Sequence, residues 1–229
     1  MIRDMPDILL IKLAMKLLPK KTLSRQARKP SGPIGRYIMT RMFNSGNADL
    51  NAFVQELLDI KTNDRVLEIG FGPGKLIAQM AEQIGSGRVE GIDFSAAMLE
   101  QASKANRSHI ETGKVKLYQG ECLVLPFADN SFDKLCAINI LYFWKQPERY
   151  FREMWRVLKP QGKIVIGFRD AQQMSRLNFN EEIFTTYSQQ GVVTLLKDAG
   201  FANAYSTDKD GKPFISYCVI ATKLETADK

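Results

Sequence analysis

The stretch Glu68-Ile69-Gly70-Phe71-Gly72-Pro73-Gly74 decides the fold, because it joins the apolar run 65–69 to a helical pattern that begins at Lys75. A strand that ends in glycines before a helix lets the backbone approach a nucleotide or an anion closely. A Cβ would clash at such a turn, and positive φ angles cost little only for glycine. The stretch therefore predicts the opening strand, turn and helix of an α/β domain that binds a nucleotide-like ligand.

Helical patterns and apolar runs alternate on both sides of this turn. Strands are expected at 65–69, 88–92, 114–118, 134–138, 163–168, 202–206 and 214–222. Helices are expected at about 48–59, 75–84, 96–106, 147–158 and 192–199. Strands that alternate with helices at this spacing predict a mostly parallel sheet. Turn formers at 208–211 predict a hairpin between the last two strands, and residues 170–187 interrupt the alternation.

The positive charge of the chain is concentrated at its N-terminus. Residues 1–41 hold ten Lys and Arg against Asp4 and Asp7, a net charge of +8, whereas the remaining residues sum to −1. Turn formers at 29–33 and a second break at 44–47 separate this region from the regular alternation. We therefore expect a basic helical N-terminal extension over 1–47 and a cofactor-binding domain over 48–229. A near-neutral domain argues against a nucleic-acid partner.

The segment 8–18 is apolar except for a narrow stripe formed by Lys12 and Lys16. It is too short and too charged to span a bilayer, which needs about 20 mostly apolar residues, and it lacks the pattern of a signal peptide. Such a helix either packs on its own domain or lies at a lipid interface. We therefore expect a cytoplasmic protein with a peripheral membrane or lipid contact through residues 1–30 as the alternative role of this segment.

The three cysteines, Cys122, Cys136 and Cys218, are widely spaced and form no CxxC pair. This spacing argues against a disulfide framework and against a zinc site. The sequence therefore indicates a reducing compartment and no metal.

Three acids follow successive strands of the predicted sheet. Glu68 lies just before the first glycine, where a carboxylate repels a pyrophosphate and favours a cationic ligand. Asp93 ends the next strand, 23 residues after Gly70, and a carboxylate there can accept both hydroxyls of a ribose. Glu121 follows the third strand, where it can accept the exocyclic amine of an adenine. The acids predict a cationic, adenosyl-containing ligand.

These residues resemble the class I S-adenosylmethionine-dependent methyltransferases of the small-molecule type, and are similar to the ubiquinone/menaquinone C-methyltransferase family. The resemblance covers about residues 50–168. It rests on four ordered motifs: Val66-Leu67-Glu68-Ile69-Gly70-Phe71-Gly72-Pro73-Gly74, Gly91-Ile92-Asp93-Phe94-Ser95, Leu125-Pro126-Phe127 with Ser131-Phe132-Asp133, and Arg156-Val157-Leu158-Lys159-Pro160-Gln161-Gly162.

The resemblance implies a three-layer Rossmann-like fold with seven strands in the order 3-2-1-4-5-7-6, the last one antiparallel. It also implies that the glycine turn holds the methionine part of S-adenosylmethionine, that Asp93 holds the ribose and that the acid after the third strand holds the adenine. The product would be S-adenosylhomocysteine. The cofactor-binding residues implied are Glu68, Gly70, Phe71, Gly72, Gly74, Asp93, Phe94, Ser95, Met98, Glu121, Cys122, Leu123 and Asn139.

Two positions depart from the family pattern. The adenine acid is usually an Asp in Gly-Asp-Ala, but here Glu121 is followed by Cys122. Gln161 stands where the family commonly has glycine, at a turn away from the cofactor edge, so we expect only a local structural consequence there.

Methyl transfer mainly requires that a nucleophile be held in line with the S–CH₃ bond and that water be excluded. His109 precedes a strand, at the edge opposite the ligand, so it is expected to be a surface residue with no catalytic role. Substrate contacts are expected from the connections after the fourth and fifth strands, from 170–187 and from 37–44. The candidates are Tyr37, Phe43, Tyr142 and Arg169, and Tyr142 and Arg169 could equally be structural. The apolar residues Met39, Met42, Phe43, Phe143 and Trp144 are either pocket or core.

The leading hypothesis is methylation of a small acceptor, apolar or aromatic, with the N-terminal extension closing over it. The alternatives are a methyltransferase acting on a nucleic acid or a protein, and a non-catalytic cofactor-binding module. The sequence carries no Asn/Asp-Pro-Pro-Tyr motif of amino-directed DNA and RNA enzymes, which argues against the first alternative. The methyl acceptor, the methylated atom and the oligomeric state stay open.

Overall fold

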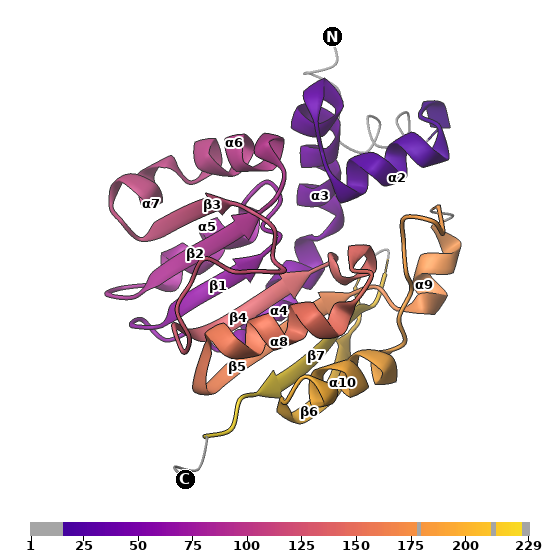
Figure 1. Cartoon of the computed structure of the whole chain (residues 1–229). Helices are drawn as coiled ribbons and strands as arrows, with labels where there is room; N and C mark the ends of the chain where they lie inside the picture. Colours follow the sequence, from indigo (N-terminus) through magenta and orange to yellow (C-terminus); the bar gives the residue numbers. More distant parts are fainter. Residues whose placement is uncertain (1–15, 178–179, 212–213, 226–229) are drawn as a thin grey trace.

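The computed structural model describes residues 16–177, 180–211 and 214–225 of the chain. Its centre is one seven-stranded sheet in the order β3-β2-β1-β4-β5-β7-β6 (Figure 1). Strands β1 to β5 pair in parallel, and β7 pairs antiparallel with both β5 and β6. The expected strand order and fold class are thus confirmed. The strands are β1 Arg65–Ile69, β2 Arg88–Asp93, β3 Val115–Gln119, β4 Phe132–Ile138, β5 Leu158–Phe168, β6 Ala202–Lys209 and β7 Ser216–Thr222.

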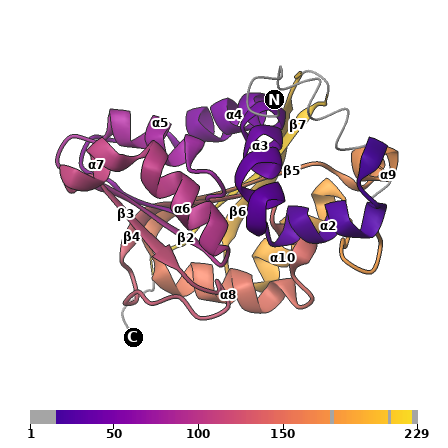
Figure 2. The ribbon, with the colours of Figure 1, turned by 90° about the horizontal axis from the view of Figure 1, so that it is seen from above.

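Helices cover both faces of the sheet (Figures 1 and 2). One face carries α4 Ala48–Leu58, α5 Lys75–Gln83, α6 Ala96–Ala105 and the short α7 Arg107–Glu111, and the other carries α8 Pro147–Val157 and α10 Gln189–Asp198. Alternation along the strands supplies both apolar layers, because successive side chains of a strand point to opposite faces. In β1, Val66 packs into the cluster under α4 and α5, whereas Leu67 packs into the cluster under α8 and α10.

The clearest difference from the expected elements lies at the start of β5. This strand begins at Leu158 instead of 163, and α8 ends one residue before the expected end. The turn formers Pro160 and Gly162 sit in an irregular stretch where the register between β4 and β5 shifts. Gln161, in the position that is commonly glycine, has a φ of 62° and donates its backbone N–H to the Lys223 carbonyl at 2.7 Å. The departure thus has the local consequence that we expected.

The N-terminal extension lies over the end of the sheet where the parallel strands finish (Figure 1). It comprises α2 Lys20–Arg28, the π-helical turn η2 Ile34–Met39 and α3 Thr40–Gly46. The expected turn at 29–33 separates α2 from η2 and is tied to the domain, because the Ser95 hydroxyl donates a hydrogen bond to the Pro30 carbonyl at 2.6 Å. Most of the apolar segment 8–18 lies outside the described residues. No helix among the described residues is long and apolar enough to cross a membrane.

The interruption at 170–187 contains the short helix α9 Ala171–Arg176, which lies beside α2 in both views (Figures 1 and 2). The backbone N–H of Asn180 donates to the Ser24 hydroxyl at 3.1 Å, and Lys21 pairs with Glu182 at 3.4 Å. The helix α2 and the 170–187 segment, which are far apart in the sequence, therefore contact each other over the end of the sheet where the parallel strands finish.

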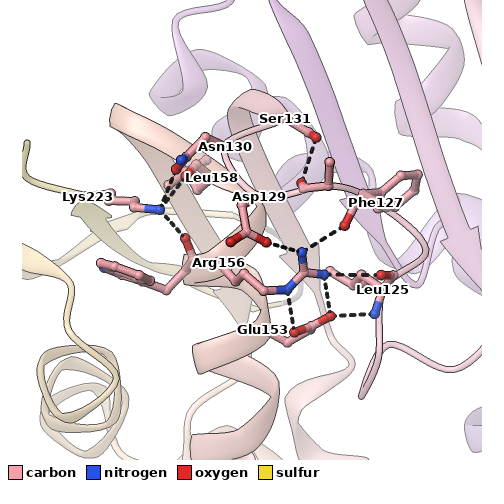
Figure 3. A network of polar contacts seen from close by, with 11 residues as sticks. Leu125, Phe127, Asp129, Asn130, Ser131, Glu153, Arg156, Leu158 and Lys223 are labelled. Atoms are coloured by element: carbon pink, nitrogen blue, oxygen red, sulfur yellow. Dashed lines mark hydrogen bonds and ion pairs between the residues drawn. The ribbon is translucent and has the colours of Figure 1, made fainter. Parts of the chain in front are cut away.

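A polar network joins α8 to the loop between β3 and β4 (Figure 3). Arg156 donates to the carbonyls of Leu125 and Phe127 and to the carboxylates of Glu153 and Asp129, at distances of 2.6 to 3.2 Å. The Glu153 carboxylate also accepts the backbone N–H of Leu125 at 2.6 Å. The arginine of the fourth motif thus fixes the segment that leads away from Glu121 and Cys122.

Lys223, directly after β7, forms a second group of contacts beside this network (Figure 3). Its ammonium group donates to Asn130 Oδ1 and to the carbonyls of Trp155 and Leu158 at 2.7, 2.9 and 2.8 Å, and the residue is only 3% exposed. Lys223→Met leaves these acceptors without a donor, so we expect the free energy of unfolding to fall by about 2–4 kcal/mol.

Urea denaturation of the two proteins measures this loss. Lys209→Met is the matched control, because the Lys209–Glu56 ion pair is more than half exposed on both sides. Such surface pairs contribute about 0–1 kcal/mol. A Lys223 variant as stable as the Lys209 variant would show that the three hydrogen bonds add nothing.

Candidate functional site

A cavity of about 190 Å³ opens where β1 to β5 end, beneath the N-terminal extension. Most of the predicted site residues line it. They are Glu68, Gly70, Phe71, Gly72, Asp93, Phe94, Met98, Glu121, Cys122 and Asn139 from the cofactor set, and Phe43, Tyr142 and Arg169 from the substrate set. Gly74, Ser95, Leu123 and Tyr37 are not among the lining residues.

The glycine turn has the backbone conformation that the sequence predicts. Gly70, Gly72 and Gly74 have φ values of 72°, 53° and 80°, which L-residues with a Cβ rarely adopt. A Cβ on Gly72 would meet only Phe43, at 3.7 Å, so this glycine leaves room on the cavity side. A Cβ on Gly74 would lie 2.7 Å from the Ala102 side chain. Gly74 therefore serves the packing of the turn on α6.

Glu68 is a buried carboxylate without a partner. It is 3% exposed, and its Oε2 is fully buried and accepts no hydrogen bond from the described residues. Burial, with the nearby charge of Asp93, raises the pKa of Glu68 well above its ordinary value. A bound cation with N–H donors would supply both the missing partner and the missing charge.

Asp93, at the end of β2, is held in place by the backbone on both sides. Its Oδ1 accepts the N–H of Ser95 at 2.8 Å and its Oδ2 accepts the N–H of Gly72 at 3.0 Å. Burial raises the pKa of Asp93 to about 6. A carboxylate has about four lone-pair sites, so both oxygens can still accept ribose hydroxyls. Ser95 caps α6 by accepting the Met98 N–H, which gives it a structural part at the site's edge.

The wall after β3 is more open. Glu121 is exposed and lines the cavity beside the half-buried Cys122. Burial of the thiol raises the pKa of Cys122 to about 12, which disfavours the thiolate form of this cysteine. Trp144 and Tyr150 stack at 4.7 Å between ring centroids and line the same side.

Three residues connect the ends of β4 and β5. The Tyr142 hydroxyl donates to Asn139 Oδ1 at 2.9 Å and accepts the Arg169 backbone N–H at 2.5 Å. Asn139 has a φ of 54°, and its amide donates to Asn47 Oδ1 at 3.0 Å. Burial raises the pKa of Tyr142 far above its ordinary value. Of the two interpretations of Tyr142, its hydroxyl bonding favours the structural one, although Tyr142 is also among the residues that line the cavity.

Asn44, Met174 and Phe184 line the cavity and lie within 37–44 and 170–187, the segments from which substrate contacts were expected. The sequence missed Asn47 and Asn51. Asn47 lies between α3 and α4, and Asn51 lies on α4. The spacing of the three asparagines was a signal that could have predicted these two residues. Met39 is 1% exposed and belongs to the core. His109 lies on α7, in the connection between α6 and β3, and is not among the residues that line the cavity.

Comparison with known proteins decides the family. Residues 67–166 match the methyltransferase domain family. The uncharacterized methyltransferase YdaC of Bacillus subtilis (strain 168) is 30% identical over 193 residues, which is 84% of this chain and 99% of YdaC. The chain belongs to the methyltransferase family. The methyltransferase is an enzyme of the S-adenosylmethionine-dependent type, and S-adenosylmethionine is its cofactor.

The methyltransferase also resembles the demethylmenaquinone methyltransferase of Lactobacillus johnsonii, with 36% identity over 110 residues, 48% of this chain. The match covers only 45% of that relative. A solved S-adenosylmethionine-dependent methyltransferase from Aquifex aeolicus has a TM-score of 0.66 and 18% identity, covering 90% of this chain and 100% of that chain. This likeness concerns the fold alone.

The groups that line the cavity fit S-adenosylmethionine. The unpartnered Glu68 oxygen suits an ammonium or sulfonium group, and the open face of Gly72 leaves room beside it. Among the residues that the structure describes, no group of three or more His, Cys, Asp or Glu side chains is arranged to hold a metal.

Proposed function

We propose that the methyltransferase transfers a methyl group from S-adenosylmethionine to a small-molecule acceptor with an apolar or aromatic body. The observation that carries this proposal is that one cavity is lined both by the acids Glu68 and Asp93 and by the packed aromatic pair Phe143 and Phe184, which forms its aromatic end. A concave site of this composition suits a small acceptor better than a polymer.

At the acidic end, we assign Glu68 to the amino acid part of the cofactor, Asp93 to the ribose and Glu121 to the adenine. Gly70 and Gly72 allow the backbone to approach the ligand. Phe71, Phe94, Met98 and Cys122 supply apolar wall. Asn139 stands between the two ends, fixed by Tyr142 and Asn47.

At the aromatic end, the chain's own residues hold the acceptor and exclude water. Phe143 packs edge-on against Phe184, with ring centroids 4.8 Å apart, and Met174 lines the same wall. When bound, S-adenosylmethionine supplies a methyl group that is already activated by its sulfonium charge. The residues of this wall would then mainly have to orient the nucleophilic atom of the acceptor toward that methyl group.

The extension 1–47 acts in this proposal as a cover, because Ala27, Arg28 and Pro30 line the cavity. We also propose that the protein is cytoplasmic and contacts lipid peripherally through residues 1–30. The exposed side chains of Lys20, Lys21 and Arg25 on α2 support the lipid contact, since basic helices are attracted to anionic membranes.

Thermal unfolding with S-adenosylmethionine, S-adenosylhomocysteine, NAD and NADP tests the cofactor assignment. We expect the first two to raise the unfolding temperature, because a ligand that binds only the native state stabilises it by mass action. Transfer of labelled methyl to hydroxylated naphthalenes and quinols, with bulk tRNA and unfolded protein as competing acceptors, then tests the acceptor class. Labelling of the polymers alone would overturn the small-molecule proposal, and labelling of none would favour a non-catalytic module.

A further inference from the structure

The cavity carries opposite charges at its two ends. Glu68 lies near the end of β1 and Asp93 ends β2, whereas Arg169 follows β5, and β4 lies between β1 and β5 in the sheet. Two other cations line the cavity, the exposed Arg28 and Lys75, which donates to the Asn44 carbonyl at 3.3 Å. Of these three cavity cations, Arg169 is the one that directly follows a strand of the sheet.

Few described groups bind the guanidinium of Arg169. Its Nη2 donates to the Gly46 carbonyl at 2.8 Å, and its Cζ lies 4.8 Å from the centroid of the Phe214 ring. Arg169 also lines a smaller hollow together with Gly46, Asp49 and Phe214, and its bond to the Gly46 carbonyl is exposed to solvent. Its Nε is fully buried without a hydrogen-bond partner, and among the described residues Arg169 forms no ion pair. Burial lowers the pKa of the guanidinium, but an arginine remains charged at any physiological pH.

The position of Arg169 is fixed by its own backbone. Its N–H donates to the Tyr142 hydroxyl at 2.5 Å, and its carbonyl lies 3.2 Å from the same hydroxyl. The Tyr142 hydroxyl also donates a hydrogen bond to Asn139, the residue that we placed between the acidic and the aromatic end of the cavity. The backbone of Arg169 is therefore fixed beside Tyr142 and Asn139, which line the same cavity. A fixed backbone next to the site is one requirement for an anchoring residue.

We propose that Arg169 binds an anionic oxygen group, such as a carboxylate, on the methyl acceptor. The inference rests on the proposed function and adds the charge of its substrate. Only one described acceptor, the Gly46 carbonyl, meets the five N–H donors of the guanidinium. An acceptor anion would supply the missing counter-charge through charge-assisted hydrogen bonds. Its apolar body would lie on the wall formed by Phe143, Phe184 and Met174.

The test compares two probes that differ by one carboxylate, 3-hydroxy-2-naphthoate and 2-naphthol. Binding is measured by calorimetry on the full chain saturated with S-adenosylhomocysteine. We expect the wild-type protein to prefer the naphthoate by about tenfold or more, since hydrogen bonds to charged groups contribute about 1.5–3 kcal/mol. Arg169→Gln should abolish the preference by weakening naphthoate binding alone. Arg169→Lys should keep part of it.

Arg176→Gln, a change at an exposed arginine on α9, is the matched control and should keep the full preference. Thermal unfolding of each variant detects a purely structural role of Arg169, in which the cation only holds the end of α3 at Gly46. Equal binding of the two probes to the wild-type protein overturns the inference, as does an unchanged preference in Arg169→Gln. If Arg169→Gln does not fold, the inference is tested by the preference of the wild-type protein for the naphthoate and by the preference that Arg169→Lys keeps.

Failure of this inference is distinguishable from failure of the proposed function. If S-adenosylhomocysteine binds and naphthols are methylated without any preference for the carboxylate, only the role of Arg169 is wrong. If neither S-adenosylmethionine nor S-adenosylhomocysteine binds, the proposed function itself fails.

Discussion

Glu68→Gln is expected to stabilise the ligand-free methyltransferase while weakening its binding of S-adenosylmethionine. The substitution keeps the shape of the side chain and removes a buried charge whose Oε2 has no described partner. We expect the free energy of unfolding at pH 8 to rise by about 1–3 kcal/mol. The dissociation constant for S-adenosylmethionine should increase by about 10- to 100-fold, the scale of a lost charge-assisted contact.

The stability gain depends on pH in a defined direction. Because the pKa of Glu68 in the folded protein is raised above the ordinary value of 4.5, the folded state holds its proton more tightly than the unfolded state. Ionisation of Glu68 therefore destabilises the fold as the pH rises above this ordinary value. Near pH 4 the wild-type side chain is neutral and resembles glutamine. The difference between the two proteins should be small there and should grow with pH, measured by urea denaturation at a series of pH values.

Glu90→Gln is the matched control. Glu90 is as buried as Glu68, at 2% exposure, but it pairs with Arg65 at 2.6 Å and accepts the Tyr118 hydroxyl at 2.8 Å. Its neutralisation should lower stability and leave cofactor binding unchanged. A Glu68 variant that loses stability at pH 8, or that binds S-adenosylmethionine as tightly as the wild-type protein, would contradict the role assigned to Glu68.

Removal of residues 1–29 is expected to reduce methyl transfer far more than cofactor binding. The deletion takes away Ala27 and Arg28 from the cavity wall and the contacts of α2 with Asn180 and Glu182. It keeps Pro30, whose carbonyl accepts the Ser95 hydroxyl near Asp93. We expect kcat to fall by about 100-fold, because an acceptor that is poorly oriented and exposed to water reacts slowly.

Transfer of labelled methyl to the best acceptor of the panel gives kcat, and calorimetry gives the dissociation constant of S-adenosylhomocysteine. The latter should stay within about threefold, a difference of less than 1.4 kcal/mol. Removal of residues 1–15 alone, which spares α2, serves as the control and should leave kcat nearly unchanged. Equal kcat for the intact chain and the shorter one that starts at Pro30 would exclude a covering role. Flotation of the intact chain alone with anionic liposomes would instead favour the lipid contact.

Local patterns in the sequence carried most of the fold. The alternation of Val66 and Leu67 between two apolar layers follows from the period of a strand, and the positive φ of Gly70 and Gly72 follows from the absence of a Cβ. The start of β5 was not predictable in this way, because Pro160 and Gly162 look like a turn. The ladder with β4 and the bond from Gln161 to Lys223 extend the strand through it.

Some features of the site also follow from the sequence, and others depend on the tertiary structure. The sequence by itself determined the glycine turn and the acids Glu68 and Asp93, because each lies at or directly after the end of a strand and parallel strands finish at one sheet edge. Only the tertiary structure decided that Glu68 Oε2 has no hydrogen-bond partner among the described residues and that Gly74 packs on α6 instead of lining the cavity. It also decided that Arg169 forms no ion pair within the described part of the chain. These properties depend on which groups surround a side chain, and the neighbours come from distant segments such as α3, α6 and 170–187. The glycine turn thus indicates the methyl donor, whereas features of the acceptor end emerge only when the chain has folded.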